Sequence, residues 1–130
     1  MIQEERAGQL LDEAFEQFFR SVAPEEVVEA GLKKYARLRV SRADKQVPCG
    51  GNLYSQARQL LTEKGTVLED EPERRLLLAT GGGVKQQNPA ILEMLFTEES
   101  LTLTAWAKEG LIPQRTAQGA VRSALSALGL

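Results

Sequence analysis

Prolines and glycine clusters divide this chain into short segments, and those segments limit the folds that it can adopt. The 130 residues include five prolines and eleven glycines. The clearest breaks are the loop at Val47–Asn52, the triple glycine at Gly81–Gly83 and the pair Asn88–Pro89. Each break marks a loop or the start of a new element, because proline and glycine disfavour an uninterrupted helix. At this length we expect residues 1–130 to form a single domain.

The spacing of apolar residues predicts helices over most of the chain. Residues 2–22 carry apolar side chains one, three and four positions apart, which indicates an amphipathic helix. Pro24 suits the first turn of a second helix, and Asn52 is a good N-cap for a third helix over 53–64. Later helices are expected to start at Asn88–Pro89, at Ser100 or Thr102, and at Pro113.

Residues 66–80 allow two interpretations. Thr66–Glu69 could pair with Arg75–Thr80 as a small β-hairpin, or Asp70 could cap a short helix over 71–79, which we slightly favour. The predicted fold class is therefore mainly α: a compact bundle of about six short helices, with one small β-hairpin around 66–80 as the open alternative.

Composition excludes several kinds of chemistry. The chain has no histidine, so it lacks the commonest general base and zinc ligand. Its single cysteine, Cys49, has no sequence neighbour that would activate it. The acids Asp12, Glu13 and Glu16 fit a solvated helix face better than a metal site. We expect no catalytic residue, cofactor or metal, hence no enzyme, and a cytoplasmic protein without a membrane-spanning segment.

The glycine-rich stretch "TGGGVKQQNP" (Thr80–Pro89) raises the question of nucleotide binding. A phosphate-binding P-loop needs a lysine followed by serine or threonine at the start of a helix. Lys85 lies two residues after Gly83, and no hydroxyl residue follows it. We therefore interpret the stretch as a joint between two elements.

Basic residues gather between 33 and 45, after an acidic N-terminal region. Residues 1–29 hold eight acids and two bases, whereas residues 33–45 hold six bases and one acid, Asp44. On a helix the bases could contact DNA phosphates, pair with the acidic first helix, or remain solvated. The candidate nucleic-acid-binding residues are Lys33, Lys34, Arg37, Arg39, Arg42 and Lys45.

The C-terminal region has the outline of a helix-turn-helix, with the turn at Gly110. The side chains available for a DNA groove are Gln114, Arg115, Gln118 and Arg122. An ordinary helical hairpin is the interpretation that we favour.

Three stretches together resemble the small terminase subunits of tailed phages and prophages. They are "LYSQARQLLTEKGTVLED" (Leu53–Asp70), "GGGVKQQNPAI" (Gly81–Ile91) and "LTAWAKEGLIPQRTA" (Leu103–Ala117). The resemblance implies a non-enzymatic DNA-packaging factor in the bacterial host cytoplasm. Such a factor would bind double-stranded DNA, form a homo-oligomer and hand the DNA to a large terminase subunit. The alternative is a small all-helical protein–protein adaptor or assembly factor that does not bind nucleic acid.

Overall fold

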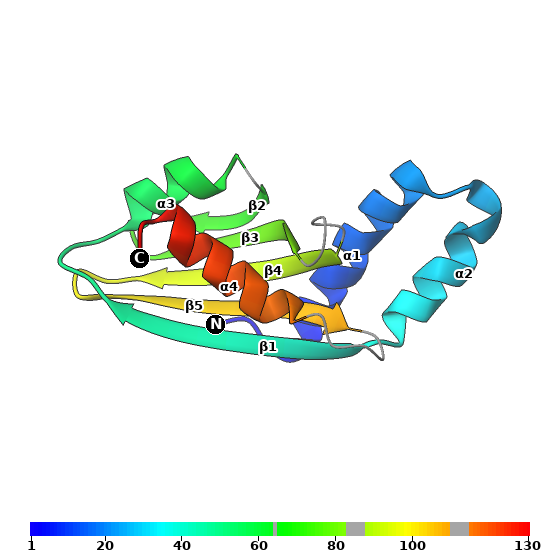
Figure 1. Cartoon of the computed structure of the whole chain (residues 1–130), viewed down its shortest axis with the longest axis horizontal. Coiled ribbons are helices and arrows are strands. Elements are labelled where there is room, and N and C mark those ends of the chain that lie inside the picture. Colours follow the sequence, from blue (N-terminus) through cyan, green and yellow to red (C-terminus); the bar gives the residue numbers. More distant parts are fainter. Residues whose placement is uncertain (64, 83–87, 110–114) are drawn as a thin grey trace.

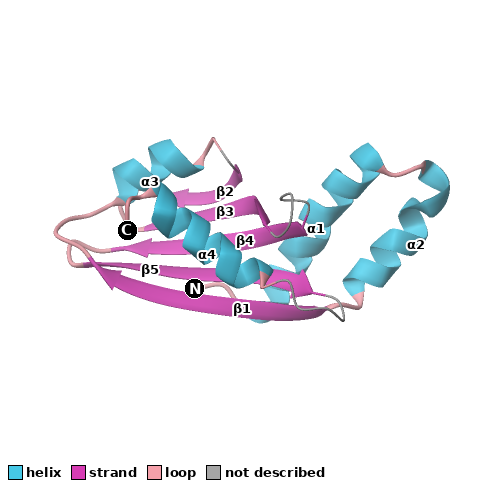
Figure 2. Ribbon diagram, viewed as in Figure 1, coloured by secondary structure: helices cyan, strands magenta, loops and turns pink. Residues whose placement is uncertain are grey.

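The computed structural model describes residues 1–63, 65–82, 88–109 and 115–130. Within these ranges it contains four helices and one five-stranded sheet (Figures 1 and 2). In chain order the elements are α1 (Glu4–Val22), α2 (Glu25–Ala36), β1 (Arg39–Pro48), α3 (Tyr54–Leu61), β2 (Gly65–Glu71), β3 (Arg75–Gly82), β4 (Asn88–Phe96), β5 (Ser100–Glu109) and α4 (Thr116–Ala127).

The prediction of a mainly α bundle of about six helices is wrong, and the fold is α+β. Residues 88–109, interpreted as parts of two helices, form β4 and β5. The two strands are buried on both faces for most of their length, as the run Ala90–Met94 illustrates. A strand covered on both faces shows no alternation of apolar and polar residues, so its sequence is easily interpreted as helical.

Other boundaries follow the sequence more closely. The predicted first, second and third helices are confirmed as α1, α2 and α3, and the last expected helix is α4. Asn52 was expected to be the N-cap of the third helix, but the N-cap is Leu53; Asn52 lies one residue earlier and accepts a hydrogen bond from the Tyr54 amide at 2.9 Å. Residues 66–80 form the β2–β3 hairpin, so the helical interpretation of this segment is wrong.

The sheet is antiparallel throughout, with strand order β1-β5-β4-β3-β2. β1 pairs with β5 in one unbroken register, from Arg39 opposite Glu109 to Pro48 opposite Ser100. The β2–β3 pairing has a register shift between Val67 and Glu69. β1 and β2 are thus the two edges, and only β2 contains an irregularity.

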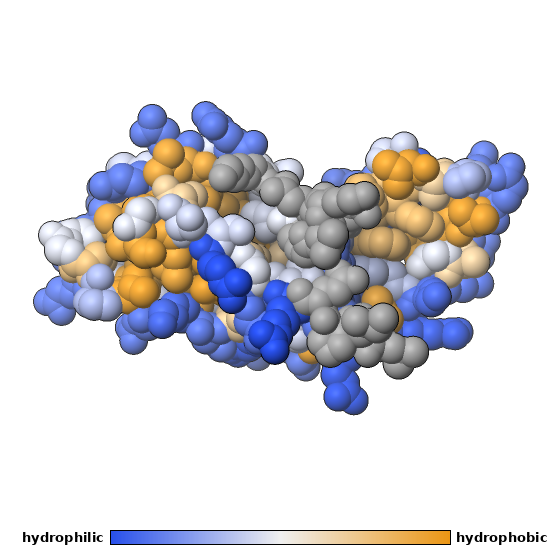
Figure 3. Space-filling model, viewed as in Figure 1, coloured by the Kyte–Doolittle hydropathy of each residue, from blue (hydrophilic) through white to orange (hydrophobic). Residues whose placement is uncertain are grey.

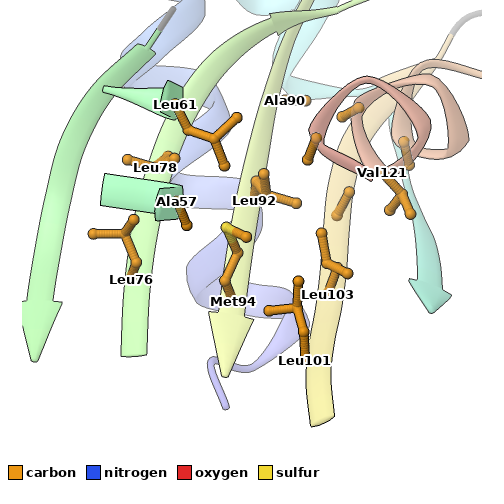
Figure 4. Packing of buried hydrophobic residues seen from close by; sticks show 14 of the residues in the cluster. Ala57, Leu61, Leu76, Leu78, Ala90, Leu92, Met94, Leu101, Leu103 and Val121 are labelled. Carbon is orange, nitrogen blue, oxygen red and sulfur yellow. The ribbon is translucent and has the colours of Figure 1, made fainter. Parts of the chain in front are cut away.

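Helices α3 and α4 cover one face of the sheet and form the main core with it. Figure 4 shows side chains of β3, β4 and β5 directed toward Ala57 and Leu61 of α3 and Val121 of α4. The small residues Ala117 and Ala124 let α4 approach the sheet closely. The fully buried leucines and methionine of this face stabilise the fold by about 1.5–3 kcal/mol each: Leu76, Leu78, Met94, Leu101 and Leu103.

Helix α1 covers only part of the opposite face. Its N-terminal half places Ala7 and Leu11 against Leu77, Ile91 and Trp106, and all five side chains are buried. Its C-terminal half continues past the end of the strands, and α2 returns beside it toward β1 (Figure 1). The sheet therefore has one fully covered face and one that is only partly covered.

Aromatic contacts hold the α1–α2 hairpin together. Phe15 of α1 stacks on Tyr35 of α2 with ring centroids 4.0 Å apart, and Phe19 lies 5.1 Å from Phe15. Gly31 leaves room for Phe19, because a Cβ at this position would lie 2.2 Å from the ring. The glycine that interrupts the helical pattern is thus a site of close helix–helix approach.

Substitution of two glycines tests how closely β2 packs against β3. A Cβ on Gly65 would lie 2.6 Å from the backbone carbonyl oxygen of Ala79 in the adjacent strand. We expect Gly65→Ala to lower the free energy of unfolding by about 1–3 kcal/mol, measured by urea denaturation. As a control, Gly119 lies within α4 with no atom within 4 Å of its added Cβ, so Gly119→Ala should stabilise by about 0.5–1 kcal/mol. A neutral Gly65→Ala variant would contradict this geometry.

Candidate functional site

The six basic residues proposed for DNA contact do not lie on one helical surface. Lys33 and Lys34 are in the last turn of α2, and Arg37 follows as its C-cap. Arg39, Arg42 and Lys45 lie on β1 instead. Side chains alternate along a strand, so Lys45 is on the opposite face of the sheet from Arg42.

Two of these bases are engaged within the protein. Lys33 forms an exposed pair with Glu29 at 3.2 Å. Arg42 donates to both carboxylate oxygens of Asp44, at 2.8 and 2.9 Å, and its guanidinium lies 4.9 Å from the centre of the Trp106 ring. The hydrogen bond from Arg42 keeps the pKa of Asp44 below its ordinary value, and the Thr104 hydroxyl, 2.8 Å away, adds to this effect.

The three acids of α1 that were considered as a metal site, Asp12, Glu13 and Glu16, have different surroundings. Asp12 binds Lys108, Glu16 pairs with Arg20 at 2.8 Å, and Glu13 faces a groove described below. Across residues 1–63, 65–82, 88–109 and 115–130, no three His, Cys, Asp or Glu residues are placed to hold a metal ion. In the same ranges, no helix is both long enough and apolar enough to cross a membrane.

The two glycine-containing motifs are only partly described. Residues 83–87 of the triple-glycine stretch and the proposed turn at Gly110 lie outside the described residues. Asn88 begins a strand, not the expected helix, and its side-chain amide donates to the Lys108 carbonyl oxygen and to Thr116 Oγ1. Both the helix-turn-helix and the ordinary helical hairpin that we favoured are wrong, because the segment before the turn, Ser100–Glu109, is strand β5. Cys49 is half-buried in the loop after β1.

A buried lysine connects the helical hairpin to the sheet. Lys108 on β5 has an exposed fraction of only 5%, yet its Nζ donates to Asp12 of α1 at 2.8 Å and to the Ala36 carbonyl oxygen of α2 at 3.1 Å. The same ammonium lies 5.4 Å from the centre of the Tyr35 ring. A buried charge is costly unless it is paired, so these contacts fix where both helices lie.

A second charged network connects the start of α1 to strands β2, β3 and β4. Glu93 is 1% exposed and accepts hydrogen bonds from Arg75 Nε at 2.7 Å and from the Ile2 amide at 3.2 Å. Arg75 also binds Glu69 at 2.7 Å, and Glu69 pairs with Arg6 of α1. Glu71 also pairs with Arg75, at 3.3 Å, so all three carboxylates named in this network have a cationic partner and the network stabilises the structure.

A groove of about 460 Å³ lies between α1 and the β2–β3 edge. One wall is a single face of α1, and the other comes from the ends of β2, β3 and β4. The α1 wall consists of Leu10, Glu13, Ala14, Gln17 and Phe18, and the strand wall of Thr66, Leu68, Ala79, Thr80, Gly81 and Pro89. Leu68 lies at the register shift of β2 and is 38% exposed, unusual for a leucine in a strand.

Apolar side chains are also exposed at the tip of the α1–α2 hairpin. Val22 and Val27 are 62% and 46% exposed at the turn between α1 and α2. In Figure 3 apolar residues gather over the hairpin on the right of the view. Contiguous exposed apolar surface usually marks a place where another molecule binds.

No protein family model matches the chain, and no curated protein is significantly similar to it. The resemblance to small terminase subunits therefore remains a hypothesis, and function has to be argued from the groove and the charges around it.

The bond between Asp12 and Lys108 is open to a direct test. Asp12→Ala removes the carboxylate that neutralises a buried ammonium, and we expect a loss of about 1.5–3 kcal/mol in the free energy of unfolding. Glu16→Ala is the matched control on the same helix, because the Glu16–Arg20 pair is exposed and should cost less than about 0.5 kcal/mol. Equal losses in urea denaturation would show that the Lys108 contact does not hold the helix.

Tyr35 predicts a dependence of stability on alkaline pH. Burial raises the pKa of this phenol above its ordinary value of 10.0, with a further contribution from the charge of Asp12. The stabilisation from the neutral buried phenol is complete below about pH 10 and is lost as the pH rises toward the folded-state pKa.

Tyr35→Phe should therefore lose less stability than the wild type between about pH 10 and pH 11 when thermal unfolding is followed by circular dichroism. Tyr54 is present in both proteins, so its titration cancels in the comparison. Identical pH profiles would mean that Tyr35 ionises as readily in the folded chain as in the unfolded one.

Proposed function

We propose that this protein is an adaptor or assembly factor that binds another protein chain and performs no chemistry of its own. The observation that carries this proposal is the groove between α1 and the β2–β3 edge. Apolar side chains from both walls face it, among them Leu10, Phe18 and Leu68. The alternative function derived from the sequence, that of an adaptor, is thus retained. The all-helical fold assumed for it is replaced by the α+β fold.

The shape of the groove suits a segment of polypeptide. Leu10, Ala14 and Phe18 follow one another every four residues, so they form a line about 12 Å long on the surface of α1. A partner helix that places apolar residues at every third or fourth position can lay them along such a line.

The charge around the groove indicates a basic partner. Among the described residues that line the groove, the one charged side chain is the acid Glu13 on the α1 wall. Rim charges of this kind steer association and select the orientation of the partner. We therefore propose an amphipathic partner segment with apolar residues on one side and lysine or arginine beside them.

DNA packaging remains a second hypothesis with less support from the geometry. Lys34, Arg37 and Arg39 are exposed near the junction of α2 and β1, where they could contact phosphates. Arg42 and Lys45, however, lie on opposite faces of β1, so the proposed DNA contacts are divided. The segment Gly81–Ile91, which contributes to the family resemblance, begins in β3 and ends in β4.

Binding of a designed peptide tests the protein-binding proposal. The probe is a fluorescein-labelled helical peptide of about 20 residues, with leucines on one face and lysines beside them. We expect saturable binding in fluorescence anisotropy. Glu13→Lys should weaken it about five-fold, and Leu68→Asp about ten-fold or more.

Glu5→Lys is the matched control, because it makes the same change in charge on α1 but does not line this groove. A version of the peptide with glutamates in place of the lysines should bind more weakly. Absence of peptide binding, or equal effects of Glu13→Lys and Glu5→Lys, would contradict the proposal. Saturable binding of duplex DNA that weakens with salt and is abolished by Arg37→Glu would instead support the packaging hypothesis.

A further inference from the structure

The outer edge of β1 is a long and regular strand edge. β1 pairs with β5 over all ten of its residues without a register shift, and its single proline, Pro48, is the last of them. In the part of the chain that the structure describes, no strand pairs with the other side of β1. Backbone N–H and C=O groups on that side are available to another strand.

The opposite edge of the sheet has protection that β1 lacks. β2 contains the register shift at Leu68, which interrupts regular pairing. Beside it, Tyr54 and Arg58 of α3 both bind Asp70 of β2, so side chains of the helix reach toward that edge. An edge that is regular and not covered by a helix is suited to pairing with another strand.

We propose that β1 pairs with β1 of a second copy of this chain, forming a two-fold symmetric dimer with one continuous ten-stranded sheet. The strands would run antiparallel, with Ala43 of each copy opposite Ala43 of the other. In this register Arg42 lies opposite Asp44 of the second copy, and Asp44 lies opposite its Arg42. The symmetry repeats every contact, as an isologous interface requires.

The sequence of β1 favours this register over its neighbours. Residues directly opposite in an antiparallel pair point to the same face of the sheet, so their charges interact. A two-fold axis one residue later would place Asp44 against Asp44, and one residue earlier would place Arg42 against Arg42. Only the axis at Ala43 pairs opposite charges and avoids both repulsions.

The groups that would make the contact are already held in place. Arg42 lies over the Trp106 ring, and Asp44 accepts a hydrogen bond from Thr104 at 2.8 Å. Within one copy these side chains bind each other, so two copies would bring together a ring of two arginines and two aspartates. On the other face Lys45 would meet Ser41 of the second copy, which introduces no like-charge contact.

This dimer is independent of the proposed protein-binding groove. β1 and β2 are at opposite edges of the sheet, so pairing through β1 leaves the groove beside β2 open. Failure of either proposal leaves the other in place.

Charge exchange across the two-fold axis provides the test. Sedimentation velocity should show the wild-type chain as a dimer that dissociates on dilution. Arg42→Asp places two aspartates opposite each other and Asp44→Arg two arginines, so each single variant should raise the dimer Kd about ten-fold or more. The double variant R42D/D44R restores opposite charges and should dimerise like the wild type.

Mixing the two single variants separates an effect on the dimer interface from an effect on folding of the single chain. In an equimolar mixture the chain with Arg42→Asp presents aspartates at positions 42 and 44, and the chain with Asp44→Arg presents arginines at both. Every pair across the axis is then of opposite charge, so native mass spectrometry should detect the heterodimer. Circular dichroism of each variant checks that it is folded. A monomeric wild type, single variants that dimerise unchanged, or a mixture without heterodimer would each overturn the proposal.

Discussion

The arrangement of the helical hairpin depends on one ammonium group removed from water. Lys108 projects from β5. Its ammonium binds Asp12 on α1 and the carbonyl oxygen of Ala36, the last residue of α2. Solvation by water is replaced here by two oxygen acceptors and an aromatic face, and these contacts require both helices to be present. Loss of either helix would remove one of the two oxygen acceptors of this ammonium, so hairpin and sheet stabilise each other.

The two faces of the sheet are covered to different extents. The face under α3 and α4 is packed with leucine and alanine side chains. The face under α1 is only partly covered, and the charged residues near its uncovered end are paired among themselves, as Arg75 and Glu93 show. The apolar surface that remains open beside α1 is therefore the part of this face that can exchange water for a partner.

The sequence predicted some elements well because their signals were local. The apolar stripe of residues 2–22 and the helix-start signals at Pro24 and Asn52 led to helices that the structure contains, although both residues lie just before the first helical residue. β4 and β5 were misjudged because burial on both faces removes the alternation that identifies a strand. β1 was misjudged because its arginines and lysine resembled a basic helical face, whereas they are distributed over both faces of a strand.

The candidate site was less accessible to sequence reasoning, because its parts come together only through the tertiary fold. Nothing near Lys108 in the sequence indicates that its partner is Asp12, almost one hundred residues away. The groove combines α1 with β2, β3 and β4, and the exposure of Leu68 follows from its place on the edge strand β2, which the sequence did not reveal. The sequence showed the charge pattern of residues 1–45, but it did not show on which surfaces of the folded protein those charges lie.

The position of the single tryptophan gives the protein a built-in optical reporter. Trp106 is 2% exposed, lies beneath α1 and has the Arg42 guanidinium over its ring. Separation of α1 from the sheet would admit water to the indole and move its emission to longer wavelength. Because there is no other tryptophan in the chain, intrinsic fluorescence distinguishes opening of the helical layer from events elsewhere without any label.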